Sequence, residues 1–211
     1  MIKNPYPGKF IALEGPDGSG QSTQASKLAR YLERLHKKNP ERYAPVHMTK
    51  EPSTGLFGGF IREVLRGNWK HGPLHGPLLI QSLFTADRAH HLEHEIIPQL
   101  KKGNTVITDR YAFSTIAYGA AENPNLWNCL VVMNETFLEP DVTILLDVSA
   151  DFCMKRMKKS RAHLELYEKE KTLEKVLKNY HKLAKLHSSI HVINGELSID
   201  KVFTNIKKIV L

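Results

Sequence analysis

Short apolar runs alternate with longer amphipathic segments along most of the 211-residue chain. The apolar runs predict strands at residues 10–13, 44–49, 105–108, 142–146 and 189–193. Apolar residues at near-helical spacing predict helices at residues 23–38, 59–66, 78–102, 114–120, 150–159, 171–185 and 199–210. This repeated strand and helix order is typical of an α/β protein.

The predicted strands are apolar without alternation, as in Val142 to Leu146, which indicates strands buried on both faces of a sheet. We therefore predict a parallel five-stranded sheet with helices on both faces. The chain length and a hydrophobic fraction of 41% fit a single domain over residues 1–211. Ligands of such sheets bind at the carboxyl ends of the strands.

A glycine-rich segment lies between the first strand and the first helix. It consists of Gly15, Pro16, Asp17, Gly18, Ser19, Gly20, Gln21, Ser22 and Thr23. This is the P-loop pattern, in which backbone N–H groups and a lysine bind phosphates and a hydroxyl holds Mg²⁺, except that Gln21 replaces the lysine. A glycine-rich turn without a ligand is the alternative, but the hydroxyls and the flanking elements favour nucleotide binding.

Asp109 and Arg110 follow the strand at residues 105–108, at the same edge of the sheet as the glycine-rich segment. A carboxylate there can hold a metal ion or its water, and a guanidinium can bind two phosphate oxygens. The alternative is an ion pair that caps the strand. Their place beside the P-loop favours a functional role.

Phe84 and Arg88 lie four residues apart in the predicted helix at residues 78–102, so they share a face. An aromatic ring can stack on a nucleobase while a guanidinium bonds to its edge. On spacing alone, a phenylalanine in the core is the more common arrangement.

The net charge limits the classes of ligand that the protein can bind, and the cysteine content indicates its compartment. The formal net charge of +8 fits a ligand that carries phosphates, but basic and aromatic residues do not interleave as in nucleic-acid modules. Cys129 and Cys153 form no paired motif and are expected to be reduced thiols in a cytoplasmic protein. No run approaches the roughly 20 apolar residues of a membrane span, so no membrane partner is expected.

Several motifs in this order resemble the thymidylate kinase family from end to end. They are EGPDGSG at residues 14–20, TKEP at 49–52, LFTADR at 83–88, DRYAFS at 109–114 with Tyr118, PD at 140–141, LDV at 146–148, and YE at 167–168 before Tyr180. The resemblance implies a P-loop NTPase fold. It also implies a homodimer that transfers the γ-phosphoryl group of ATP to dTMP with Mg²⁺.

The resemblance also implies roles for single residues. On the donor side, residues 15–23 would cradle the ATP phosphates, Ser22 would bind Mg²⁺, and Asp17 would reach the metal or the acceptor's sugar hydroxyl. Arg110 would bind the acceptor phosphate. The remaining acceptor contacts would come from Phe84 stacking on thymine, Arg88 and Thr115 at its edge, Tyr118 at the 2′ position, and Glu51 and Pro52 in the pocket wall.

Some family members carry an arginine in the P-loop, but Gly18 occupies that position here. The resemblance therefore places the transferring cation in a lid segment around residues 154–168. The candidates are Arg156, Lys158, Lys159 and Arg161, with Arg161 favoured and Arg156 next. The alternative for these residues is a solvated basic helix face.

The lost P-loop lysine is the main departure from the family. Loss of one transition-state donor costs roughly 2–4 kcal/mol, on the order of 10²–10³ in rate. Either the lid compensates or the enzyme is slow. In addition, Lys50 replaces an arginine that is common at its position, which leaves phosphate contacts there in doubt.

Two alternative functions remain open from the sequence. One is a kinase for another deoxynucleoside monophosphate or for a deoxynucleoside, although Arg110 in the acceptor-phosphate position disfavours a nucleoside. The other is a nucleotide sensor that binds both ligands without transfer. Detection of dTDP separates the sensor from the kinases.

Overall fold

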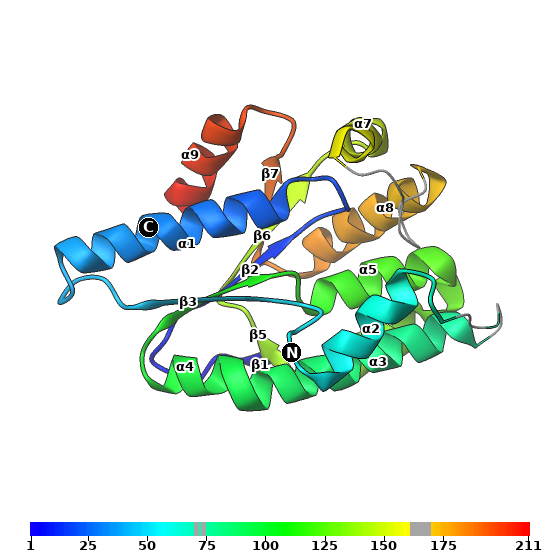
Figure 1. The fold of residues 1–211 in the computed structure, drawn as a ribbon, viewed down its shortest axis with the longest axis horizontal. Coiled ribbons are helices and arrows are strands. Elements are labelled where there is room, and N and C mark those ends of the chain that lie inside the picture. Colours follow the sequence, from blue (N-terminus) through cyan, green and yellow to red (C-terminus); the bar gives the residue numbers. More distant parts are fainter. Residues whose placement is uncertain (70–71, 73–74, 161–169) are drawn as a thin grey trace.

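A computed structural model of the chain describes residues 1–69, 72, 75–160 and 170–211. Its centre is a five-stranded sheet in the order β3-β4-β2-β6-β7 with every pair parallel (Figure 1). The strands are β2 (Phe10–Glu14), β3 (Val46–Lys50), β4 (Thr105–Asp109), β6 (Val142–Asp147) and β7 (Ile190–Asn194). The predicted α/β class and parallel sheet are therefore confirmed.

Helices cover both faces of the sheet (Figure 1). One face packs against α1 (Gln21–Lys38), α7 (Ala150–Ser160) and α9 (Ile199–Val210). The other face packs against α4 (Ile97–Lys101), α5 (Ala112–Glu122) and α8 (Glu170–Leu186), and α3 (Gly76–His91) packs against α5. Two further helices lie outside these layers, α2 (Leu56–Leu65) and α6 (Trp127–Glu135).

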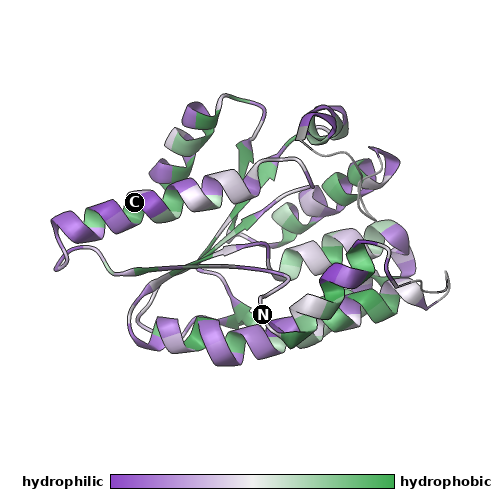
Figure 2. Ribbon diagram, viewed as in Figure 1, coloured by the Kyte–Doolittle hydropathy of each residue, from purple (hydrophilic) through white to green (hydrophobic). Residues whose placement is uncertain are grey.

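Successive residues of β2 explain why its sequence lacks alternation. Ile11 and Leu13 pack in the core under α1, whereas Phe10 and Ala12 pack in the core on the opposite face, and all four are fully buried. Burial on both faces requires apolar residues at every position. Figure 2 shows the same arrangement, with hydrophobic residues along the sheet and hydrophilic ones on the outer helix surfaces.

The structure departs from the predicted elements in three places. The helix predicted at residues 78–102 contains a π-helical turn, η1 (Leu92–Ile96), just before Pro98, which has no N–H to continue the regular bonding. The helix α6 was not predicted. A short parallel pair, β1 (Ile2–Lys3) with β5 (Leu138–Glu139), is also additional, because two-residue strands carry no periodic signal.

The carboxyl ends of β2, β3 and β4 meet at one edge of the sheet. The chain leaves β2 into the P-loop and α1, and it leaves β4 through Arg110, whose φ of 72° lies in the left-handed region. This turn at Arg110 redirects the chain into α5. None of the helices in the described ranges is long and apolar enough to cross a bilayer.

Candidate functional site

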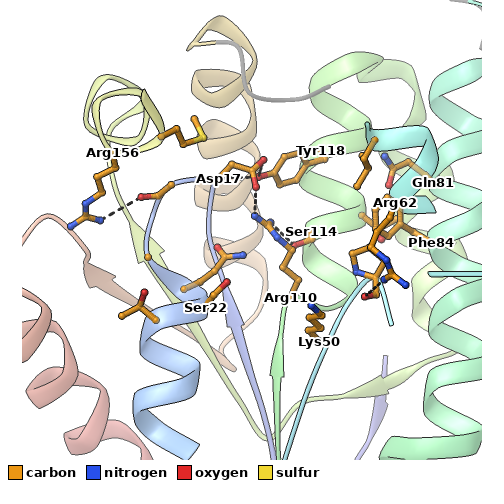
Figure 3. Close-up of a pocket in the computed structure, with 18 residues that line it drawn as sticks. Asp17, Ser22, Lys50, Arg62, Gln81, Phe84, Arg110, Ser114, Tyr118 and Arg156 are labelled. Carbon is orange, nitrogen blue, oxygen red and sulfur yellow. Dashed lines mark hydrogen bonds and ion pairs between the residues drawn. The ribbon is translucent and has the colours of Figure 1, made fainter. Parts of the chain in front are cut away.

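A cavity of about 570 Å³ opens at this edge of the sheet (Figure 3). Its walls come from the P-loop, the end of β3, α2, α3, the start of α5 and α7. The predicted site residues that line it are Asp17, Gly18, Gly20, Gln21, Ser22, Thr23, Pro52, Phe84, Arg110, Thr115, Tyr118 and Arg156.

Other predicted site residues lie outside the cavity lining. They are Gly15, Pro16, Ser19, Glu51, Arg88 and Asp109. Arg161 and most of the predicted lid lie outside the described residues. Six further lining residues were not among the predicted site residues, although the sequence had raised phosphate contacts at the first of them: Lys50, Arg62, Leu65, Gln81, Ser114 and Met157. Gln81 could have been found, because it lies one helical turn before Phe84.

The P-loop wraps the start of α1 tightly. Gly18 has a φ of 82°, and a Cβ there would lie 2.7 Å from the carbonyl oxygen of Cys153, so this position requires glycine. Gln21 is buried, and its Oε1 accepts a hydrogen bond from Ser19 Oγ at 3.0 Å. The side chain that replaces lysine therefore contributes a neutral amide to the loop.

Two oxygen ligands meet between α1 and β4. Ser22 Oγ donates to Asp109 Oδ2 at 2.5 Å, and Asp109 Oδ1 is buried with no hydrogen-bond partner among the described residues. A hydroxyl and a carboxylate are hard oxygen ligands of the kind that Mg²⁺ prefers. A bound cation would also satisfy the unpaired oxygen, so these residues fit a magnesium ion.

Asp17 bonds the P-loop to Arg110 and to Tyr118 of α5 (Figure 3). Arg110 Nη2 donates to Asp17 Oδ1 at 2.6 Å, and Arg110 Nη1 donates to the Gly15 carbonyl at 3.1 Å. Tyr118 Oη donates to Asp17 Oδ2 at 2.9 Å. Burial raises the pKa of the Tyr118 hydroxyl well above its usual value, so it stays protonated and can donate. These bonds place Arg110 between the P-loop and the start of α5.

The far end of the cavity has an aromatic wall. Phe84 and Thr115 line it, and Arg88 lies behind Thr115, 1% exposed. Arg88 donates to Thr115 Oγ1 at 3.0 Å and to Glu51 Oε2 at 2.6 Å. Arg88 therefore does not line the cavity itself. It contacts Thr115, which does, and it is fixed in place by its ion pair with Glu51.

Arg156 of α7 contacts the P-loop directly. Its Nη1 donates to the Ser19 carbonyl at 2.9 Å, and its Nη2 donates to the Gly195 carbonyl at 3.2 Å. Its guanidinium also lies 4.4 Å from the centre of the Phe152 ring. Arg156 is thus held against the P-loop by backbone carbonyls.

Glu14, the last residue of β2, joins three elements behind the cavity. Its Oε1 accepts from the backbone N–H groups of Tyr111 and Ser114 at 3.0 and 3.2 Å. Its Oε2 accepts from Ser114 Oγ at 2.5 Å and from Tyr180 Oη at 2.9 Å. Burial raises the pKa of Glu14 to about 7, although the hydrogen bond from Ser114 and the charge of Arg110 oppose this shift.

Substitution of Glu14 by Gln is expected to remove a pH dependence of stability. The folded state holds the Glu14 proton up to about pH 7, whereas the unfolded state releases it near pH 4.5. The free energy of unfolding therefore falls as the pH rises through this interval, and Glu14 accounts for about 3 kcal/mol of that fall. The free energy of unfolding in urea, measured at pH 5.0 and 7.5 for both proteins, should fall less in the variant. Equal losses in the two proteins would contradict the assignment.

Comparison with known proteins now identifies the family. A family model described as thymidylate kinase matches residues 13–206. The chain is 39% identical over 207 residues to a thymidylate kinase of Thermosipho africanus, covering 95% of this chain and 96% of that protein. It is 37% identical over 206 residues to a probable thymidylate kinase of Pyrococcus abyssi, covering 96% of each. The chain belongs to the thymidylate kinase family.

Membership in the thymidylate kinase family fixes the class of chemistry. The fold is the P-loop NTPase fold, and the protein is an ATP-dependent phosphotransferase that acts on nucleotides.

Proposed function

We propose that this thymidylate kinase family member transfers the γ-phosphoryl group of ATP to dTMP and releases dTDP and ADP. The observation that carries the proposal is the single cavity in which the P-loop and the aromatic wall at Phe84 face each other, joined by the bond between Asp17 and Arg110. A cavity of about 570 Å³ suits nucleotide-sized ligands.

The proposed reaction needs alignment and positive charge more than a strong base, because a phosphate monoester is already ionised near neutral pH. The P-loop N–H groups would hold the ATP phosphates. Arg110 would bind the acceptor phosphate with two parallel hydrogen bonds. Phe84 would stack on thymine, Thr115 would bond to its edge, and Tyr118 would lie beside the 2′ position of the sugar.

We propose Mg²⁺ as the cofactor, held by Ser22 with Asp109. The support is the 2.5 Å contact between their oxygens and the unpaired Asp109 Oδ1. When bound, the ion would supply positive charge next to the phosphates. The two side chains would hold that ion at the carboxyl end of β4, next to the P-loop.

A coupled assay with a panel of deoxynucleoside monophosphates and thymidine tests the proposed function. We expect dTMP to be converted to dTDP with the highest kcat/KM. Phe84 and Thr115 would contact its thymine, and Arg110 would bind the phosphate that thymidine lacks. If another monophosphate has a higher kcat/KM, that nucleotide is the acceptor and the proposal of dTMP is wrong. Binding of ATP and dTMP by calorimetry without product would favour a nucleotide sensor.

We also propose that Gln21 lowers turnover more than it lowers affinity for ATP. The backbone cradle is retained, but a neutral amide gives weaker phosphate bonds than an ammonium group. Gln21→Lys is therefore expected to raise kcat, with a smaller change in the KM for ATP, in steady-state kinetics. An unchanged or lower kcat would contradict this proposal.

The remaining proposals concern the whole molecule. We propose a single domain over residues 1–211 with a lid around residues 154–168, and Arg156 supports the lid because it already contacts the P-loop. We propose a homodimer, because Leu56, Phe60 and Trp69 expose apolar surface at α2 and just after it. Light scattering should then give twice the chain mass of 24.0 kDa. Two free thiols and nucleotide substrates favour the cytoplasm.

A further inference from the structure

The P-loop lacks its lysine, so the positive charge on the phosphoryl group in transit must come from elsewhere in the cavity. Four cationic side chains line the described part of the cavity, Lys50, Arg62, Arg110 and Arg156. These four are the local candidates to replace the missing ammonium group.

Three of the four cations are already bonded to protein acceptors. Arg62 donates to the Ser53 carbonyl at 2.6 Å, and the contacts of Arg110 with Asp17 and of Arg156 with the P-loop carbonyls are described above. The Lys50 ammonium makes no hydrogen bond or ion pair with the described residues, and the side chain is exposed to the cavity. Among these four cations, Lys50 is therefore the one whose charge is not already shared with an acceptor in the described residues.

The register of the sheet directs Lys50 to the phosphate side. Lys50 is the last residue of β3 and pairs with Asp109, the last residue of β4. Residues paired in a parallel ladder leave the sheet on the same face. Asp109 leaves it toward α1, where its carboxylate contacts Ser22. Lys50 thus leaves the sheet toward α1 as well, about 4.8 Å along from Asp109.

We propose that Lys50 supplies to the transferring phosphoryl group the positive charge that Gln21 cannot supply. Lysine suits this role because its ammonium is a compact charge on a flexible stem, as in the ordinary P-loop. It would approach the phosphates from β3 instead of from the start of α1. The inference rests on the proposed dTMP kinase reaction and makes Lys50 a catalytic residue.

A double-mutant cycle tests the inference. The proteins are the wild type, Gln21→Lys, Lys50→Met and the double variant, with kcat measured at saturating ATP and dTMP. Lys50→Met should lower kcat by about 10²-fold, the effect of removing one transition-state donor. Gln21→Lys should raise kcat by less than about tenfold in the wild type but by about 10²-fold in the Lys50→Met protein, because either lysine can serve the same phosphoryl group.

Matched variants exclude a general effect of charge. Lys38→Met removes the same charge at the far end of α1, about 25 Å from Gln21, and should leave kcat unchanged. Lys50→Arg keeps the charge and should retain kcat within about tenfold. Equal gains from Gln21→Lys in both backgrounds would overturn the role of Lys50, and so would an unchanged kcat in Lys50→Met.

A binding measurement distinguishes failure of this inference from failure of the proposed function. Calorimetry with adenosine and thymidine joined through five phosphates measures affinity without turnover. Lys50→Met should weaken this binding at least tenfold, and added Gln21→Lys should restore it. A wild type that makes no dTDP but shows this loss and rescue would contradict the proposed reaction alone. An active wild type with the same affinity and kcat as the Lys50→Met protein would contradict the inference alone.

Discussion

Replacement of Arg110 by Met is expected to lower kcat for dTMP phosphorylation by about 10³-fold. Arg110 lines the cavity beside the P-loop, bonded to Asp17 at 2.6 Å and to the Gly15 carbonyl at 3.1 Å. A guanidinium in this place can bind the acceptor phosphate through two N–H groups while its other bonds fix its position. Methionine keeps the apolar stem and removes both the charge and the alignment.

The Arg110 prediction is checked by steady-state kinetics together with urea unfolding. Arg110→Lys restores the charge without the planar fork, so it should recover kcat only in part and remain at least about tenfold below the wild type. A kcat near that of the wild type, or a loss of activity that follows a loss of folded protein, would refute the role.

The sequence was most informative where local chemistry fixes the backbone. Apolar runs predicted the five strands of the main sheet, and the runs without alternation became β2 and β6, which are buried on both faces. Glycines at residues 15, 18 and 20 predicted the loop, since each adopts a positive φ that other residues rarely reach. Both features are local, and they predicted the edge of the sheet at which the cavity opens.

Contacts between distant segments could not be predicted in the same way. Glu14 is in sequence only the last residue of a strand, yet its oxygens bond to Ser114 and Tyr180, which lie 100 and 166 residues away. Likewise, the availability of Lys50 depends on which acceptors hold the other cations. Arg88 shares a face with Phe84, as predicted, but the packing of Glu51 and Thr115 decides that it lies behind the cavity wall.

Replacement of Arg88 by Met is expected to destabilise the protein by about 3–5 kcal/mol, the largest stability effect that we predict. Arg88 and Glu51 form an ion pair at 2.6 Å, and both side chains are at least 98% buried. Removal of the guanidinium would leave the Glu51 carboxylate in the interior without its cation. Asn134 Oδ1, which accepts from Arg88 at 2.5 Å, would also lose its donor.

Two variants separate burial of this charge from the simple loss of an ion pair. Arg66→Met breaks an exposed pair with Glu63 at 2.7 Å and should cost less than about 1 kcal/mol. Adding Glu51→Gln to Arg88→Met removes the unpaired charge and should recover part of the lost stability, because the penalty comes from an isolated buried carboxylate. Urea unfolding at pH 7.5 measures all four proteins. If Arg88→Met lies within about 1 kcal/mol of the wild type, or the added Glu51→Gln lowers stability further, the buried pair does not hold this wall of the cavity.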